Sequence, residues 1–143
     1  MDPLSIAASA IAIATIAGQV CTLFGELRSL CRSLPGRLAA VNNEVADLEI
    51  VLHEIASLVE KRAALPDSKR STLPHLLKQA NTKLRELEVV VRHIRVSCRD
   101  ARHPLLAANV LRKEQGPVKL LQEEIRAIKC NLNILLGASN SWV

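Results

Sequence analysis

The chain of 143 residues has few aromatic residues and few of the residues that make tight turns. Phe24 and Trp142 are its only Phe, Tyr or Trp residues, and it contains five glycines and six prolines. Recognition of unpaired bases usually needs aromatic platforms, so this composition argues against a nucleic-acid partner. The scarcity of glycine and proline argues against a β-sandwich or barrel with many tight turns. The length fits a single domain with one core.

The sequence also lacks the short motifs that accompany many enzymatic and cofactor sites. It has no G-x-x-x-x-G-K-[ST] loop and no G-x-G-x-x-G turn, the two patterns that hold nucleotide phosphates. Its four histidines are scattered, and His53-Glu54 is followed by Ser57 where a zinc-binding H-E-x-x-H helix needs its second histidine. We therefore expect a protein that is not an enzyme, with no catalytic residue, metal, cofactor or small-molecule substrate.

Charge is absent from the first part of the chain, because the 23 residues from Pro3 to Gly25 include no Asp, Glu, Lys or Arg. As a helix this segment would be about 35 Å long, enough to cross the roughly 30 Å core of a bilayer. Many of its residues are alanine or polar, so its composition is that of a marginal membrane-spanning segment. No Lys or Arg precedes Arg28, which argues against a secretory signal peptide. The residues that we expect to enter a membrane are Leu4, Ile6, Ile11, Ile13, Ile16, Val20, Leu23 and Phe24.

The four cysteines form no C-x-x-C pair and show no regular spacing. Each lies in or beside an apolar stripe, which favours buried free thiols. This usage is typical of a reducing, intracellular setting, and we expect a cytoplasmic protein. The cysteines are Cys21, Cys31, Cys98 and Cys130.

Apolar residues recur every three or four positions along most of the chain, as in helices that each bury one face. The pattern predicts helices over 2–34 and 37–65, a third from Ser71 or Thr72 to Arg102, and a fourth after Gly116-Pro117. Residues 105–115 are expected to form a short helix or an ordered connector. The expected fold class is all-α: an antiparallel four-helix bundle of long helices with this short extra helix or connector before the last one.

Each predicted helix has its own apolar stripe. In the first it comprises Ile6, Ile13, Ile16, Val20, Leu23, Leu27, Leu30 and Leu34, and in the second Leu38, Val41, Val45, Leu48, Leu52, Ile55 and Val59. In the third it comprises Leu73, Leu77, Ala80, Leu84, Leu87, Val91, Ile94 and Cys98, and in the last Val118, Leu121, Ile125, Ile128, Leu132 and Leu135.

The end of the chain is predicted to leave the bundle. Gly137 is placed as the C-terminal stop of the last helix, and Ser139-Asn140-Ser141 looks like the start of a linker. We therefore expect a single helical domain over residues 1–137, with residues 138–143 beginning a linker or tail in a longer protein.

The net charge of +5 is unevenly distributed, since residues 37–66 sum to −2 and residues 67–104 sum to +5. Four arginines at helical spacing form a candidate patch for an anionic surface, where each basic residue contributes about 1 kcal/mol. The alternative is a solvated face that pairs with the acidic second helix. The arginines are Arg92, Arg95, Arg99 and Arg102, and the acidic residues are Glu44, Asp47, Glu49, Glu54 and Glu60.

Three small residues of the first predicted helix, Ala10, Ala14 and Gly18, are four positions apart. In lipid, such a small-xxx-small face permits two helices to approach closely. The same spacing is equally consistent with ordinary tight packing inside the bundle.

The opening residues Met1-Asp2-Pro3-Leu4-Ser5-Ile6-Ala7-Ala8-Ser9-Ala10-Ile11-Ala12 closely resemble the start of the N-terminal domains of fungal STAND (NLR-like) receptors of the HeLo-like type. The resemblance is specific over roughly the first 25 residues, Gly18 included. Beyond them it is one of layout: a Pro-Gly break, long heptad helices, and a last helix with Leu-Asn-Ile-Leu-Leu.

This resemblance implies a cell-death or innate-immunity effector that is joined to a nucleotide-binding oligomerisation domain and repeats. It implies a bundle that is held inactive, then oligomerises and delivers its N-terminal helix to the plasma membrane. The implied partners are an anionic membrane surface after activation, further copies of the chain, and the rest of the receptor. The alternative is an interaction or oligomerisation scaffold whose first helix stays buried. The uncharged segment 3–25 favours the effector, because an outer helix of a scaffold would normally show a charged face.

Overall fold

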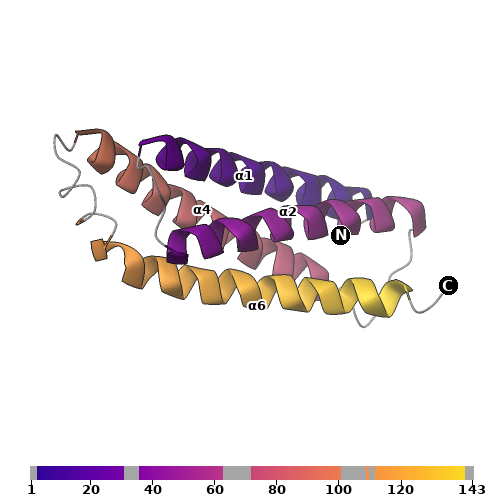
Figure 1. Ribbon diagram of the computed structural model, residues 1–143. Helices are drawn as coiled ribbons and strands as arrows, with labels where there is room; N and C mark the ends of the chain where they lie inside the picture. Colours follow the sequence, from indigo (N-terminus) through magenta and orange to yellow (C-terminus); the bar gives the residue numbers. More distant parts are fainter. Residues whose placement is uncertain (1–2, 31–35, 63–71, 101–108, 110–111, 141–143) are drawn as a thin grey trace.

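The computed structural model describes residues 3–30, 36–62, 72–100, 109 and 112–140. They form four long helices: α1 (Pro3–Leu30), α2 (Gly36–Arg62), α4 (Thr72–Asp100) and α6 (Gln115–Asn140) (Figure 1). The predicted all-α fold of four long helices is therefore confirmed. The short helix or connector predicted over 105–115 falls mostly outside the described residues, as do the predicted ends of the first three helices.

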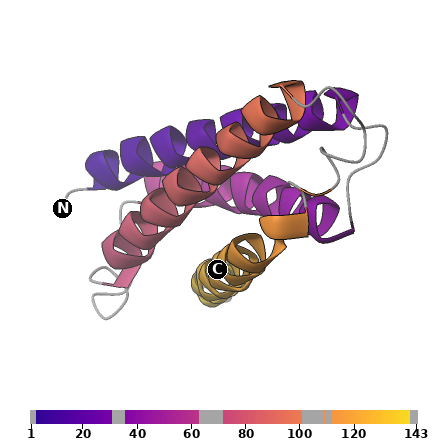
Figure 2. The same ribbon diagram turned by 90° about the vertical axis from the view of Figure 1, so that its left-hand side faces the viewer.

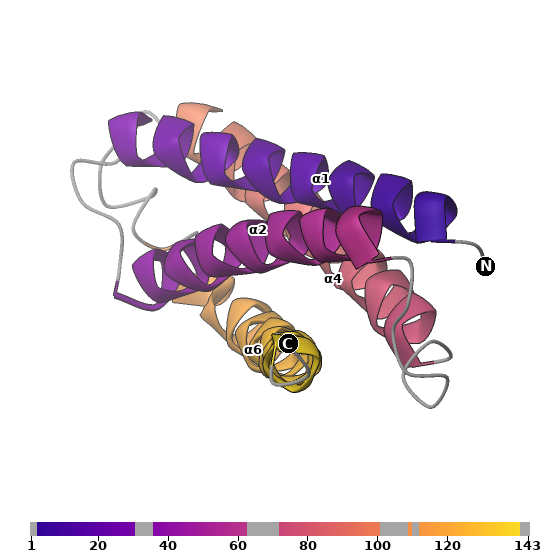
Figure 3. The same cartoon turned by 90° about the vertical axis from the view of Figure 1, so that its right-hand side faces the viewer.

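Successive helices run in opposite directions along the bundle (Figure 1). The helix pairs that pack together are α1 with α2, α1 with α4, α2 with α6, and α4 with α6. The order around the bundle is therefore α1, α2, α6, α4, with α2 and α4 at opposite corners. α4 crosses α1 at an angle in Figure 2, and Figure 3 shows α1 and α2 side by side as one antiparallel hairpin. A second hairpin of α4 and α6 packs on the first.

The core lies along the centre of this arrangement, and most predicted apolar stripes face it. Every predicted core position on α2, α4 and α6 is buried. On α1 the prediction is wrong for Leu30, which is 45% exposed. At 100° per residue, Leu30 has rotated about 120° away from the direction of Ile6, because a strict seven-residue repeat drifts around a straight helix. Leu34 lies outside the described residues.

α1 buries a wider face than a single apolar stripe would provide. Ala7, Ala10, Ala14 and Ala17 are each no more than 2% exposed, and they lie between the large apolar residues of the same helix. Alanine side chains permit close packing between helix backbones, so α1 fits into the groove between α2 and α4.

The predicted helix stop at Gly137 is wrong, because α6 continues to Asn140. A glycine that ends a helix usually adopts the left-handed conformation, and Gly137 does not. The residue is exposed, and a Cβ added to it would have no neighbour within 4 Å among the described residues. Residues 138–140 thus belong to the last helix rather than to the predicted linker.

Candidate functional site

The residues predicted to enter a membrane fall into two groups in the folded bundle. Six of the eight are in the core: Ile6, Ile13, Ile16, Val20, Leu23 and Phe24 are each at most 8% exposed. Leu4 and Ile11, by contrast, are 75% and 42% exposed. Most of the apolar surface of α1 is therefore used for packing in this conformation, and only two of the eight candidate residues face outward.

The outward face of α1 carries no charge over its first five turns. Thr15 and Thr22 on this face donate their hydroxyl groups to the backbone oxygens of Ile11 and Gly18, at 3.0 and 3.1 Å. These bonds satisfy the hydroxyl protons within the helix itself, which lowers the cost of moving the threonines into a less polar environment. The exposed residues of this face, called the neutral face below, are Leu4, Ser5, Ala8, Ile11, Ala12, Thr15, Gln19 and Thr22.

By length and composition, α1 is a helix that can cross a membrane, and half of its most apolar window is buried inside the bundle. The core helix of a soluble protein can have the same length and apolar composition. The distinguishing feature of α1 is therefore the neutral face, because a core helix at the edge of a bundle usually turns charged residues to water.

The small residues of α1 pack inside the bundle. Ala10 and Ala14 are 0% and 1% exposed. Gly18 faces α2, where an added Cβ would lie 2.9 Å from a carboxylate oxygen of Glu49. Ordinary tight packing accounts for this stripe in the present conformation, and close approach of two copies in lipid stays a prediction.

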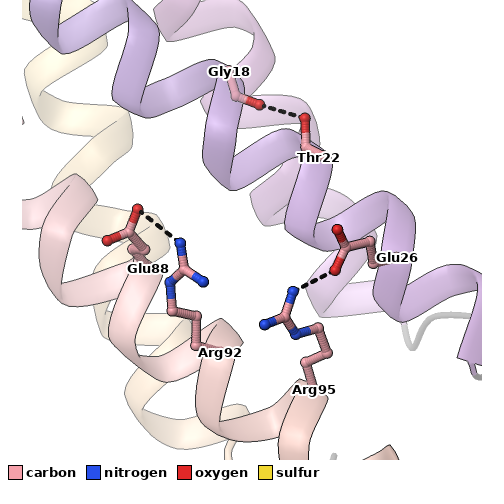
Figure 4. Close-up of polar contacts among 6 residues, drawn as sticks. All are labelled: Gly18, Thr22, Glu26, Glu88, Arg92 and Arg95. Atoms are coloured by element: carbon pink, nitrogen blue, oxygen red, sulfur yellow. Dashed lines mark hydrogen bonds and ion pairs between the residues drawn. The ribbon is translucent and has the colours of Figure 1, made fainter.

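The predicted arginine patch is divided by its contacts (Figure 4). Arg95 reaches across from α4 and forms an ion pair with Glu26 of α1. Arg92 is exposed and approaches Glu88, one turn earlier on its own helix, at 3.8 Å. Arg99 is exposed, and Arg102 lies outside the described residues. Arg95 thus joins two helices, whereas Arg92 and Arg99 remain open to a partner.

The alternative expectation was a solvated face that pairs with the acidic second helix. Arg92 and Arg99 are exposed as it expected, but none of the three described arginines forms an ion pair with α2. α2 and α4 occupy opposite corners of the bundle, and Glu44 and Asp47 of α2 meet α6 instead. The Glu44 carboxylate lies 2.5 Å from Lys129 Nζ and 3.4 Å from Arg126 Nε, and Asp47 lies 3.5 Å from Lys129 Nζ. Burial of the ammonium acts to lower the pKa of Lys129, but the contacts with Glu44 and Asp47 outweigh it and raise that pKa above the ordinary value.

The cysteines differ in exposure. Cys98 is buried and Cys21 is half-buried, but Cys130 is exposed, so the expectation of a buried thiol is wrong there. Cys130 is close in sequence to the apolar stripe of α6, but its side chain lies outside that stripe and is therefore not buried. Burial, together with the nearby charge of Glu49, raises the pKa of Cys21 and keeps its thiol neutral. Cys31 lies outside the described residues.

Sequence reasoning missed a longer stripe on the outer face of α4. Its residues follow one another at spacings of seven, four, three, four and three, so they share one side of the helix. Val89 and Val96 are 67% and 50% exposed, and basic side chains flank them. The helical spacing of this stripe was visible in the sequence, but Arg92 and Arg99 were grouped with Arg95 and not with the two valines. This basic stripe consists of Lys78, Arg85, Val89, Arg92, Val96 and Arg99, all of them exposed.

Within the described ranges, no group of three or more His, Cys, Asp or Glu side chains is placed to hold a metal ion. A small apolar hollow lies where the ends of α2 and α6 meet the start of α4, lined by Ile55, Leu58, Val59, Leu73, Leu135 and Leu136. It presents no polar group that would orient a substrate. No protein-family model, curated protein or solved structure matches the chain.

Proposed function

We propose that the chain is a non-enzymatic N-terminal signalling and effector domain of a fungal NLR-like immune receptor. It induces cell death by oligomerising and moving α1 to the plasma membrane from a resting state in the cytoplasm. Its partners in this proposal are an anionic membrane surface, further copies of itself, and the rest of the receptor chain. The resemblance of the first twelve residues to HeLo-like domains supports this proposal.

The observation that carries the proposal is the neutral face of α1. Water surrounds this face in the resting bundle, yet no charged residue lies on it before Glu26. A charged residue at the centre of a membrane helix costs about 2.5 to 3.5 kcal/mol on insertion scales, so its absence matters for a helix that enters lipid.

Movement of α1 requires the bundle to open. The buried face of α1 includes Phe24 and Leu27, each 0% exposed, and each such side chain loses about 1.5 to 3 kcal/mol on full exposure to water. Transfer to lipid or to neighbouring copies restores an apolar environment for these side chains. Oligomerisation at a membrane therefore provides the compensation that a single copy in water lacks.

The second candidate is a scaffold module whose α1 never leaves the core. The observation that favours it is the burial of six of the eight candidate insertion residues. The two functions differ in one respect that can be measured: whether the exposed side of α1 touches lipid.

The experiment is leakage of dye from anionic and neutral vesicles by the purified full chain. Deleting α1 would remove a large part of the core, so a single substitution on the neutral face is the better variant. Ile11→Glu places a carboxylate on that face, and Ile134→Glu on α6 is the matched control, since the two isoleucines are 42% and 65% exposed. We expect leakage by the unaltered chain and by Ile134→Glu, and a loss of about 100-fold in Ile11→Glu. Absence of leakage by the unaltered chain, or full leakage by Ile11→Glu, would favour the scaffold.

A further inference from the structure

Two outer stripes of the bundle have opposite charge. One is the basic stripe of α4. On α2, two carboxylates flank an exposed isoleucine: Asp47, Ile50 and Glu54 follow one another at spacings of three and four, and Ile50 is 57% exposed. Asn43 and Ser57 extend the same side of the helix, and these five residues are called the acidic stripe. The exposed surfaces of the other helices differ, since that of α1 is neutral over its first five turns. The exposed charged residues of α6 have both signs: Lys119, Glu123 and Arg126.

We propose that the chain associates with itself head to tail, with the acidic stripe of one copy against the basic stripe of the next. α2 and α4 are at opposite corners of the bundle, and each stripe consists of exposed residues of its helix, so the two stripes cannot meet within one copy. Opposite charge on opposite sides is the arrangement that lets each copy bind two neighbours in the same way.

The two stripes also match in pattern. Each has exposed apolar side chains, Ile50 on α2 and Val89 and Val96 on α4, with charged residues three or four positions before and after them. Paired helices whose apolar contacts are flanked by ion pairs have this arrangement. In the proposed contact Ile50 of one copy meets Val89 or Val96 of the other, and the Glu54 carboxylate meets an arginine. Asp47 also lies 3.5 Å from Lys129 Nζ of its own copy. Within the described residues, Arg85, Arg99 and Glu54 form no ion pair, so these charges are available to a neighbour.

This contact is heterologous, so it leaves a free stripe at each end and extends into a ring or a filament. It involves one helix from each copy, which makes a small interface, and we expect weak association that salt suppresses. The contact gives the oligomerisation step of the proposed function a surface, and it is measured without lipid. The two tests are therefore independent. Absence of vesicle leakage would contradict the proposed function but not the contact, and absence of association would contradict the contact but not the leakage result.

The test is sedimentation velocity of the full chain over a range of concentrations at low and high ionic strength. One variant reverses the basic stripe with Arg85→Glu, Arg92→Glu and Arg99→Glu, and a second reverses the acidic stripe with Glu54→Arg and Ser57→Arg. We expect the affinity of each variant for itself to fall at least about tenfold, because both of its stripes then have the same sign of charge. We expect a mixture of the two to associate again, because each supplies the charge that the other lacks.

A control variant with Arg28→Glu, Lys113→Glu and Lys119→Glu makes the same change of charge as the basic-stripe variant, on exposed residues outside both stripes. It should associate like the unaltered chain, and thermal unfolding followed by circular dichroism checks that every variant folds. The proposal is overturned if the unaltered chain stays monomeric at low salt, if the control weakens association as much as the stripe variants, or if the mixture stays monomeric. Loss of binding to anionic vesicles in the basic-stripe variant, with association unchanged, would assign that stripe to lipid instead.

Discussion

α1 and α4 are neighbours of 28 and 29 residues, yet they present opposite surfaces to water. α4 buries a narrow stripe of mostly large residues and exposes arginines, so polarity alone fixes which side faces the core. α1 buries a wide face with four alanines, and its outer side is neutral. Its position therefore depends on the shape of the groove into which it fits. A helix held in this way exchanges water for lipid on its outer face at little cost, whereas α4 would have to bury arginines.

The largest effect is expected from a charge on the inner side of α1. Ala14 is 1% exposed, so Ala14→Glu buries a carboxylate and should lower the free energy of unfolding by about 3 to 5 kcal/mol. Ala12 is exposed on the same helix, and Ala12→Glu should change it by less than about 0.5 kcal/mol. Urea unfolding followed by circular dichroism measures both. Equal effects would show that α1 has no buried side, and would remove the contrast with α4.

The two helices should be destabilised by opposite changes of volume, α4 by a loss and α1 by a gain. Leu87 of α4 is 0% exposed, and Leu87→Ala leaves a cavity that should cost about 2 to 5 kcal/mol. Ala10 of α1 is 0% exposed as well, and Ala10→Leu adds volume where helices are close, which should cost about 1 to 3 kcal/mol. The same unfolding assay reports both values. A neutral Ala10→Leu would mean that α1 is loosely packed.

A smaller change of volume on α1 should have the opposite sign. In Gly18→Ala the new Cβ would lie 2.9 Å from Glu49 Oε2, which is the far end of a flexible side chain and can move. Alanine is better than glycine inside a helix by about 0.5 to 1 kcal/mol. We therefore expect the melting temperature of Gly18→Ala to rise slightly. A clear fall would show that Glu49 is held in place and that α1 and α2 tolerate no side chain at this point.

The smallest effect is expected from the ion pair that joins α1 to α4. Glu26 and Arg95 are both partly exposed, so a double-mutant cycle with Glu26→Gln and Arg95→Gln should give a coupling free energy of about 0.2 to 1 kcal/mol. High salt should reduce this coupling. A coupling well above that range would mean that charge, rather than packing, holds α1 against the bundle.

The stripes of α2, α4 and α6 were predictable because polar residues mark the side of each helix that faces water. The neighbours of each helix were not predictable in the same way, since four helices with one stripe each can be arranged in more than one order. For this reason Arg95 was grouped with an open patch, although α1 lies beside α4 and supplies Glu26 as its partner. The predictions for Leu30 and Gly137 were wrong for more local reasons. A seven-residue repeat drifts around a helix, and a helix can continue through an exposed glycine.

The neutral face of α1 was visible in the sequence only as an uncharged segment. The sequence did not show which of its residues face outward, because every side of the segment is free of charge. The structure separates exposed Ile11 from buried Ala14. A charge at Ala14 would disturb folding as well as any membrane contact, whereas a charge at Ile11 tests the membrane contact alone.

The most direct test of the account compares the outer faces of α1 and α4 in the presence of lipid. Thr15 and Thr82 are exposed, and each donates its hydroxyl to the backbone oxygen four residues earlier at 3.0 Å, so they are matched sites for a label. Thr15→Cys and Thr82→Cys, made in a chain whose native cysteines are replaced by alanine, would each carry a dye whose emission shifts to the blue in an apolar environment. The account predicts a blue shift with anionic vesicles at position 15 and none at position 82. No shift at position 15, or equal shifts at both positions, would contradict it.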